Sequence, residues 1–146
     1  MPVLFHSEKS SFTIDNEEVI SNWIRAVLSH HGAHAGDINI IFVNNEYILE
    51  LNKKYLKHNY YTDVITFEYS EGKVISGDVF ISVDQVLINS QIENVTFYNE
   101  LFRVIIHGIL HLLGYNDQTD EEKAVIRDEE NLSLRLLENF DHGKDI

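Results

Sequence analysis

The chain has 146 residues, 44% of them hydrophobic, which predicts one globular domain over 1–146 with a sizeable core. It has no cysteine, which excludes disulfides and thiolate metal sites and fits a cytoplasmic location, and no apolar stretch is long enough to cross a membrane. The formal net charge of −13 argues against a broadly basic nucleic-acid-binding surface, so any such surface has to be local.

The N-terminal half is predicted to form three strands and two helices. The strands are expected at Val3–His6, Phe12–Ile14 and Asp37–Val43. Asp15 and Glu18 have the spacing of a capping box, which starts the first helix, and Gly32 ends it. A second helix begins near Asn45. Its apolar side chains, expected to be buried, are Ile48, Leu51 and Tyr55.

The C-terminal half is predicted to form two strands, joined through a turn at Glu71-Gly72, and three helices. The strands are expected at Val64–Tyr69 and Val79–Ser82, and the first helix at Asp84–Ile92. Thr96 caps the next helix, and Thr119 with Glu122 opens a final one that ends near Asn139. Because strands and helices do not alternate strictly, the sequence predicts an α+β fold with a small mixed sheet and about five helices.

Two histidines four residues apart, His107 and His111, lie in the apolar segment HGILHLLGYND. Four residues is about one helical turn, so both rings leave the helix on the same face and are able to bind one metal ion. A pair like this on a core helix is often only two satisfied histidines. Gly114, suited to ending the helix, and Asp117, a possible third ligand, shift the balance toward a metal.

The spacing of these residues is that of metzincin proteases, with one difference. A zincin has a glutamate general base directly after the first histidine, whereas this chain has Gly108. Three protein ligands leave one tetrahedral position open, which is typical of a catalytic rather than a structural metal site. The pattern therefore keeps the ligand geometry of a hydrolase and lacks the peptidase base.

The same segment resembles the signature HGxLHLxGYDH of the YbeY endoribonucleases, also called rRNA maturation factors. The match runs from His107 through Tyr115. Further matching blocks are Asn52 with Tyr55, Thr62–Phe67, and Gly77–Val79 with Ser82. Glu130 lies where the family tends to carry a glutamate. The resemblance covers the chain from about Asp37 to the C-terminus.

Three positions depart from the family pattern. Asn116 and Asp117 stand where the family has aspartate and a third histidine, and Leu56 stands where it has an arginine. Lys57 follows and supplies a positive charge without the planar fork of an arginine. A carboxylate oxygen at 117 is still a zinc ligand, although an anionic ligand weakens the metal as a Lewis acid. The carboxylate also suits harder ions such as Mn²⁺.

The resemblance implies a sheet packed against helices, with the metal-bearing helix in a cleft. It also implies a zinc-dependent endoribonuclease, with one Zn²⁺ per chain, that cuts single-stranded rRNA regions during ribosome maturation. Small-subunit ribosomal proteins and an assembly GTPase are the implied partners. Two alternatives stay open. One is a metallopeptidase-like hydrolase, which Gly108 opposes, and the other is a ribosome-assembly factor with a structural metal, which the acidic charge and Leu56 favour.

Beyond the ligands His107, His111 and Asp117, the sequence offers several candidate catalytic and substrate-binding residues. Lys57 is a candidate for stabilising charge on the phosphate, and the general base is left open among Asp63, Asp78 and Glu100. No acid–base pair built on histidine is evident outside the ligands, so water is favoured over the RNA 2′-hydroxyl as the nucleophile. The candidate substrate-binding residues are Lys53, Lys54, His58 and Arg103.

Two further groups have simpler interpretations. Arg103 and Glu100 share a helix face with His107. We expect Arg103 to form an ion pair within the helix in preference to a phosphate contact. The other group, His30, His31 and His34, surrounds the end of the first helix. Gly32 interrupts the helical register there, so this cluster is interpreted as surface and not as a metal site.

Overall fold

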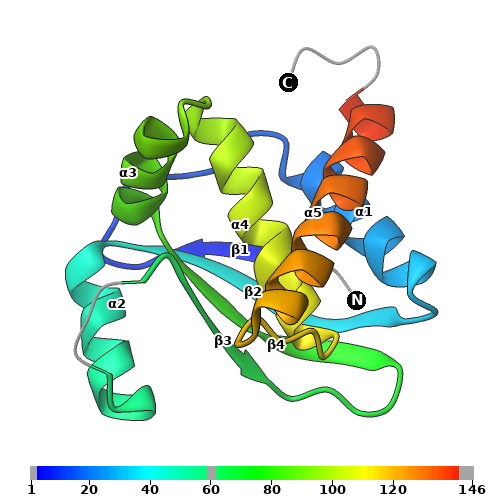
Figure 1. The fold of residues 1–146 in the computed structure, drawn as a ribbon, viewed down its shortest axis with the longest axis horizontal. Helices are drawn as coiled ribbons and strands as arrows, with labels where there is room; N and C mark the ends of the chain where they lie inside the picture. Colours follow the sequence, from blue (N-terminus) through cyan, green and yellow to red (C-terminus); the bar gives the residue numbers. More distant parts are fainter. Residues whose placement is uncertain (1–2, 59–61, 142–146) are drawn as a thin grey trace.

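The computed structural model describes residues 3–58 and 62–141, which form a four-stranded mixed sheet with helices on both faces (Figure 1). The strands are β1 (Val3–Ser7), β2 (His34–Val43), β3 (Val64–Glu68) and β4 (Val74–Ser82). The α-helices are α1 (Glu17–His30), α2 (Asn45–Leu51), α3 (Val83–Glu93), α4 (Phe97–Leu112) and α5 (Asp120–Asp141). A π-helical segment, η1 (Asn52–Leu56), continues α2. The predicted α+β class, with a small mixed sheet and five α-helices in the described residues, is confirmed.

The sheet has the strand order β1-β2-β4-β3. The first three strands in this order are parallel, and β3 is antiparallel to β4. In the hairpin between β3 and β4, Glu71 and Val74 exchange two backbone hydrogen bonds of 3.0 Å, and Gly72 has a φ of 59°, as the predicted turn requires. Among the described strands, β3 pairs with β4 alone, so the other edge of β3 has no strand beside it. Residues 64–66 of this edge strand line the pocket that is described below.

The main core lies between the sheet and the helices α1, α4 and α5 (Figure 1). Trp23 of α1 is fully buried there, and its indole N–H donates to the Ser133 carbonyl oxygen of α5 over 2.7 Å. A smaller cluster on the opposite face packs α2 against β2, β3 and β4. Its buried members are Ile41, Val43, Ile48 and Ile65. No helix in the described part of the chain is long and apolar enough to span a bilayer.

Helix α4 is the central helix, and two glycines let it approach the sheet closely. Thr96 caps it by accepting a hydrogen bond from the Asn99 backbone N–H, as predicted. A Cβ atom on Gly108 would lie 2.6 Å from Cγ1 of Val79 in β4. A Cβ on Gly77 of β4 would lie 2.8 Å from Leu112 Cδ2. The close contact sets the height of α4, and therefore of its histidines, above the edge of the sheet.

Two predictions for the N-terminal segment are wrong. The expected strand Phe12–Ile14 pairs with no described strand, because Phe12 instead packs its ring edge-on against Phe42 at a centroid distance of 5.0 Å. Asp15 does not cap α1. The residue before the helix is Asn16, which has a left-handed backbone with φ of 58° and makes no capping hydrogen bond through its side chain.

The strands β2 and β4 are longer than predicted because they extend each other. They begin at His34 and Val74, which are partners in the parallel register, with an irregularity between Ala35 and Ile38. The added segments contain polar residues, such as His34 and Ser76, that interrupt the apolar pattern expected of a strand. The predicted capping box of α5 is confirmed by reciprocal hydrogen bonds of 2.9 Å and 3.0 Å between Thr119 and Glu122.

Candidate metal centre

Three potential metal ligands converge where α4 ends. His107 and His111 lie one turn apart on α4, and Asp117 lies in the loop that follows. Asp117 Oδ2 is 3.3 Å from His107 Nε2 and 3.4 Å from His111 Nε2, and the two Nε2 atoms are 2.9 Å apart. Zinc–ligand bonds of about 2.0–2.2 Å put tetrahedral donors roughly 3.3 Å apart, so the three atoms match one metal site in size. Among the described residues, no other group of this kind occurs.

The hydrogen bonds on the far side of each imidazole favour the form that binds a metal. His107 Nδ1 lies 2.6 Å from Glu130 Oε2, and His111 Nδ1 lies 2.9 Å from the Tyr115 carbonyl oxygen. Both oxygens accept, so in the neutral rings each Nδ1 carries the hydrogen and each Nε2 keeps its lone pair. Two lone pairs that face each other over 2.9 Å repel unless a proton or a cation lies between them. The donor set therefore fits a metal ion.

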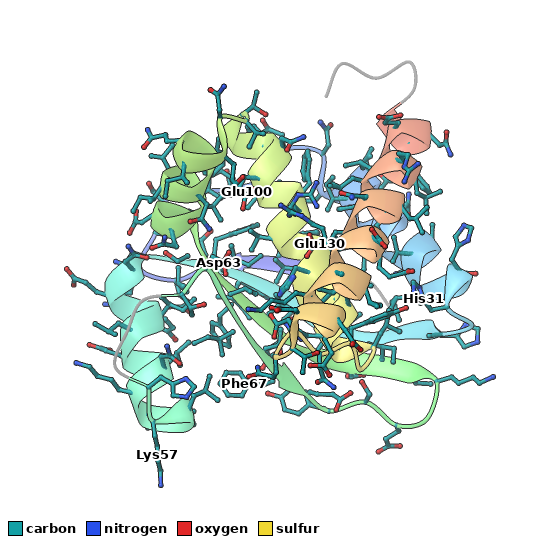
Figure 2. All side chains as sticks on the ribbon, in the orientation of Figure 1. His31, Lys57, Asp63, Phe67, Glu100 and Glu130 are labelled. Atoms are coloured by element: carbon teal, nitrogen blue, oxygen red, sulfur yellow. The ribbon has the colours of Figure 1, made fainter. Side chains whose placement is uncertain are left out.

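Glu130 of α5 is the buried anion behind His107 (Figure 2). Its other oxygen, Oε1, accepts from Arg103 Nη1 at 2.9 Å and from Arg127 Nη1 at 3.4 Å. Burial alone raises the pKa of Glu130, but the bonds from His107 and Arg103 outweigh it and leave this pKa below its ordinary value. Burial lowers the pKa of His107, yet its bond to Glu130 and the surrounding carboxylates give a net increase.

The loop after α4 holds the third ligand in place. Gly114 has a φ of 106°, and its backbone N–H donates to the His111 carbonyl oxygen. The Tyr115 backbone N–H donates to the Leu110 carbonyl oxygen over 3.0 Å. This left-handed helix end turns the chain back, which carries Asp117 to the histidines.

The three ligands open into a pocket of about 350 Å³. Its walls come from β3 and the residues just before it, from η1 and His58, and from the end of α4 with the loop that follows. The buried Asn52 contributes to the wall formed by η1. A polar pocket beside the open side of a three-ligand site has room for a substrate group to reach the metal.

Asp63 lies in this pocket, just before β3 (Figure 2). Its Oδ2 accepts a hydrogen bond from Asn89 Nδ2 of α3 over 3.1 Å. Burial raises the pKa of Asp63, and the neighbouring His107 opposes the increase without cancelling it. Among the three candidate bases named from the sequence, Asp63 is the one that lines the pocket.

The other two candidate bases lie elsewhere. Asp78 of β4 binds Asn39 Nδ2 and the Tyr69 hydroxyl, at 3.1 Å and 2.7 Å. Its neighbour Val79 packs against α4, so Asp78 faces the opposite side of the sheet. Glu100 is buried on α4 and does not line the pocket. Burial, with the charge of Asp63, raises the pKa of Glu100.

Arg103 is neither in the pocket nor paired within its own helix. Its guanidinium spans from α4 to α5, with Nη1 2.9 Å from Glu130 Oε1 and Nη2 3.0 Å from Asn131 Oδ1. The predicted pairing with Glu100 is thus replaced by a bond between helices. Arg103 supports the anion behind His107, and a direct contact between Arg103 and a phosphate is not supported.

The basic segment is divided between the pocket and the surface. His58 lines the pocket, whereas Lys53 and Lys54 are exposed on η1. Lys57 ends η1 with a left-handed backbone of φ 58° and points away from the pocket (Figure 2), so its predicted role at the phosphate is not supported. Tyr55, expected to be buried, is 54% exposed, because the π-helical turn places it beyond the smaller core.

The comparisons with known proteins agree with this geometry. Residues 4–138 match the family model described as Endoribonuclease YbeY. The chain belongs to the YbeY endoribonuclease family. An endoribonuclease YbeY from Azobacteroides pseudotrichonymphae is 45% identical over 94% of this chain and 99% of that protein. One from Parabacteroides distasonis is 44% identical over 94% of this chain and 96% of its own length.

A solved structure has the same fold as this YbeY family member. The solution structure of TM1509 from Thermotoga maritima matches with a TM-score of 0.64 and 25% sequence identity. The alignment covers 92% of this chain and 88% of that one. The YbeY resemblance noted from the sequence motif is therefore confirmed, and so is the fold that it implied.

Gly108 has a structural reason in this YbeY chain. The space that a side chain would need at Gly108 is occupied by Val79 Cγ1, at 2.6 Å, and Val64 Cγ2, at 3.4 Å. The glutamate that a zincin carries at this point of its helix would collide with the sheet. The fold thus excludes a peptidase base at that position, which opposes the metallopeptidase alternative.

The contacts of two residues near the centre were not identified from the sequence. Glu130 was noted only as a residue that the family tends to carry, and the histidine cluster around Gly32 was assigned to the surface. His30 and His34 are indeed exposed, whereas His31 contacts Tyr115 and Glu129. No local spacing connects either residue to His107, because the helices that carry them meet only in the folded chain.

Proposed function

We propose that this chain is a metal-dependent endoribonuclease of one domain that cuts single-stranded regions of rRNA during ribosome maturation. The observation that carries the proposal is the convergence of His107 Nε2, His111 Nε2 and Asp117 Oδ2 beside an open polar pocket. Family membership supports the RNA substrate, since the curated relatives are named endoribonucleases. A single-stranded substrate is favoured because its phosphates are able to enter a pocket that a rigid duplex does not fit.

We propose Zn²⁺ as the metal, one ion per chain, held by His107, His111 and Asp117. Two imidazoles and one carboxylate form a zinc donor set, although Mn²⁺ is also compatible with the carboxylate. When bound, the ion would polarise a phosphoryl oxygen and acidify a water molecule. Glu130 and the Tyr115 carbonyl would orient the two imidazoles toward the ion.

The pocket residues suggest how protons would move during hydrolysis. Asp63, whose pKa is raised by burial, is proposed to accept the proton of the attacking water. His58 lines the same pocket and is proposed to donate a proton to the leaving oxygen. An acid–base pair outside the ligands is therefore available. Lys53 and Lys54, exposed on η1, are proposed to contact the RNA backbone beyond the pocket.

The charge of the chain favours a ribosomal context. With a net charge of −13, the protein is expected to bind bare RNA weakly, because most of its surface repels phosphates. We therefore propose that small-subunit ribosomal proteins and an assembly GTPase help to hold the substrate. A cytoplasmic location belongs to the same proposal, because ribosomes are assembled there.

The direct test combines metal analysis with cleavage assays. The protein is purified without chelators, its metal content is determined, and it is incubated with a structured rRNA fragment, its duplex form and a peptide pool. We expect about one transition-metal ion per chain and cuts in single-stranded RNA alone. His111→Ala, prepared in the same way, controls for contaminating nuclease. Absence of metal, or equal cleavage by His111→Ala, would reject the proposal, and peptide cleavage would favour the metallopeptidase.

A further inference from the structure

His31 connects the end of α1 to the loop that follows the metal-bearing helix (Figure 2). Its Nδ1 lies 2.9 Å from the Val27 carbonyl oxygen, so this nitrogen carries a hydrogen and donates it. Its Nε2 lies 3.2 Å from the Tyr115 hydroxyl and 3.1 Å from Glu129 Oε1. The rings of His31 and Tyr115 are nearly perpendicular, with centroids 5.7 Å apart. His31 is thus held by its own helix while it holds the phenol.

The contact between His31 and Tyr115 survives a change in the charge of His31. In the neutral ring, Nε2 has a lone pair and accepts from the Tyr115 hydroxyl, whereas the Glu129 carboxylate, which is also an acceptor, makes no hydrogen bond with this nitrogen. In the imidazolium, Nε2–H donates to Glu129 and to the phenol oxygen, both of which lie within 3.2 Å. The hydrogen bond between His31 and Tyr115 therefore has a donor and an acceptor in either charge state of the ring.

Tyr115 passes this restraint on to the metal ligands. Its hydroxyl is held by His31 and its backbone N–H by the Leu110 carbonyl oxygen, so the residue is fixed at both ends. Its carbonyl oxygen then accepts from His111 Nδ1–H over 2.9 Å, which orients the imidazole. Asp117 follows two residues later in the same loop. A shift of the phenol would move the carbonyl and, with it, the approach of Asp117.

We propose that His31 is a positioning residue for the metal centre, which acts by holding the Tyr115 hydroxyl and thereby fixing the carbonyl that orients His111 and the loop that carries Asp117. The inference rests on the metal site of the proposed function. It assigns a role to a histidine that lies 84 residues from Tyr115 in the sequence and is not among the residues that line the pocket.

The test measures metal affinity in the full-length protein, without RNA. The variants are His31→Ala, Tyr115→Phe and the double variant, and Zn²⁺ affinity is measured by competition with a chromogenic chelator. Partners behind metal ligands change affinity by about 10- to 100-fold, and His31 lies one step further away, so we expect about a tenfold loss in each single variant. The double variant should lose no more than either single one, because both remove the same contact.

Three further measurements separate positioning from a general structural role. His34→Ala, which removes an exposed histidine from the neighbouring turn, should bind Zn²⁺ like the wild type. His31→Gln, able to hydrogen-bond the phenol, should recover most of the affinity. The visible absorption spectrum of the Co²⁺-substituted protein should change in His31→Ala and Tyr115→Phe and be normal in the other two. Tyr115→Phe keeps the ring and its packing, so it carries the test even where His31→Ala does not fold.

The outcomes also separate this inference from the proposed function. Unchanged Zn²⁺ affinity and Co²⁺ spectrum in folded His31→Ala or Tyr115→Phe would overturn the positioning role and leave the nuclease proposal standing. Additive losses in the double variant would also overturn it. A wild type that binds Zn²⁺ and cuts no RNA would reject the nuclease proposal alone. A wild type that binds no metal would overturn both.

Discussion

His107 Nδ1 and Glu130 Oε2 lie 2.6 Å apart, which makes a residue of α5 part of the candidate metal centre. The bond joins α4 to α5 across 23 residues of sequence, and Arg103 and Arg127 stabilise the same carboxylate. A charge-assisted bond of this length fixes both the tautomer and the orientation of the His107 ring.

Replacement of this carboxylate should therefore weaken the metal site. Glu130→Gln keeps the size of the side chain and removes its charge, so we expect Zn²⁺ affinity to fall by about 10- to 100-fold. The matched control is Asp128→Asn, an exposed acid on the same helix, which should bind like the wild type. Chelator competition measures both variants. Wild-type affinity in Glu130→Gln would show that the carboxylate has no role at the metal.

Asp117 is expected to be the third ligand. Asp117→Ala should lose far more metal affinity than Asp120→Ala, because Asp120 is exposed at the start of α5. Asp117→His should retain binding, since imidazole nitrogen is also a zinc ligand. Elemental analysis and chelator competition measure the three variants. Equal affinity in the wild type and Asp117→Ala would place the third ligand elsewhere.

Gly108→Ala should destabilise the protein even though alanine is the better helix former. The added Cβ would lie 2.6 Å from Val79 Cγ1. Overpacking costs about 1–3 kcal/mol and helix propensity returns about 1 kcal/mol, so a net loss of about 1 kcal/mol is expected in the free energy of unfolding. Urea denaturation measures the change. In a Val79→Ala background, Gly108→Ala should cause a smaller loss. If Gly108→Ala alone made the protein more stable than the wild type, the close contact would be refuted.

The buried Glu100 should make stability depend on pH. Burial and the charge of Asp63 raise its pKa, so the folded protein holds this proton more tightly than the unfolded chain does. At a pH below the ordinary pKa of 4.5, Glu100 is protonated in both the folded and the unfolded chain. At a pH above the raised pKa of the folded protein, it is ionised in both, and burying this charge destabilises the folded state. Glu100→Gln should therefore stabilise the protein at about pH 7.5 and have little such effect near pH 4.

Denaturation in the presence of chelator, at both pH values, measures this effect without a contribution from metal. Glu8→Gln, in the exposed segment that follows β1, is the control, because Glu8 is not among the charges that act on Glu100, and it should show little change with pH. A Glu100→Gln variant that is less stable than the wild type at neutral pH would mean that the ionised carboxylate is well compensated, for example by Arg103.

The ends of the RNA products should distinguish two nucleophiles. If water attacks, with Asp63 accepting its proton, no 2′,3′-cyclic phosphate forms and a 2′-deoxy substitution at the cut position does not prevent cleavage. Asp63→Asn should then lower the rate by about 10²- to 10⁴-fold while Zn²⁺ affinity stays near the wild-type value. Cyclic phosphate products, with a deoxy substrate that resists cleavage, would identify the 2′-hydroxyl as the nucleophile instead.

The part of the site that follows local spacing was accessible from the sequence. His107 and His111 share a helix face because of the helical repeat, and Asp117 is close to them because a glycine turn follows directly. The same logic extends to Asp78. The residues on either side of it, Gly77 and Val79, face α4, so the alternation of a strand already directs Asp78 to the other side of the sheet.

The remaining parts depend on how distant elements pack, which no local pattern encodes. Glu130 reaches His107 only because α5 docks on α4 in one register, and His31 reaches Tyr115 only because α1 ends beside that loop. The side chain of Lys57 was expected at the phosphate and lies away from the pocket for a different reason. A π-helical turn and a left-handed residue reverse the direction of its side chain relative to Leu56 and His58, which do line the pocket.

The contribution of α5 to the metal centre also has a consequence for synthesis of the chain. A nascent polypeptide that has emerged as far as Asp117 already contains three ligands, but Glu130 has not yet been added to fix the tautomer of His107. Because translation proceeds from the N-terminus, the centre is completed only when the final helix has left the ribosome and docked. A chain that lacks α5 therefore contains all three candidate ligands but not the carboxylate that orients the His107 ring.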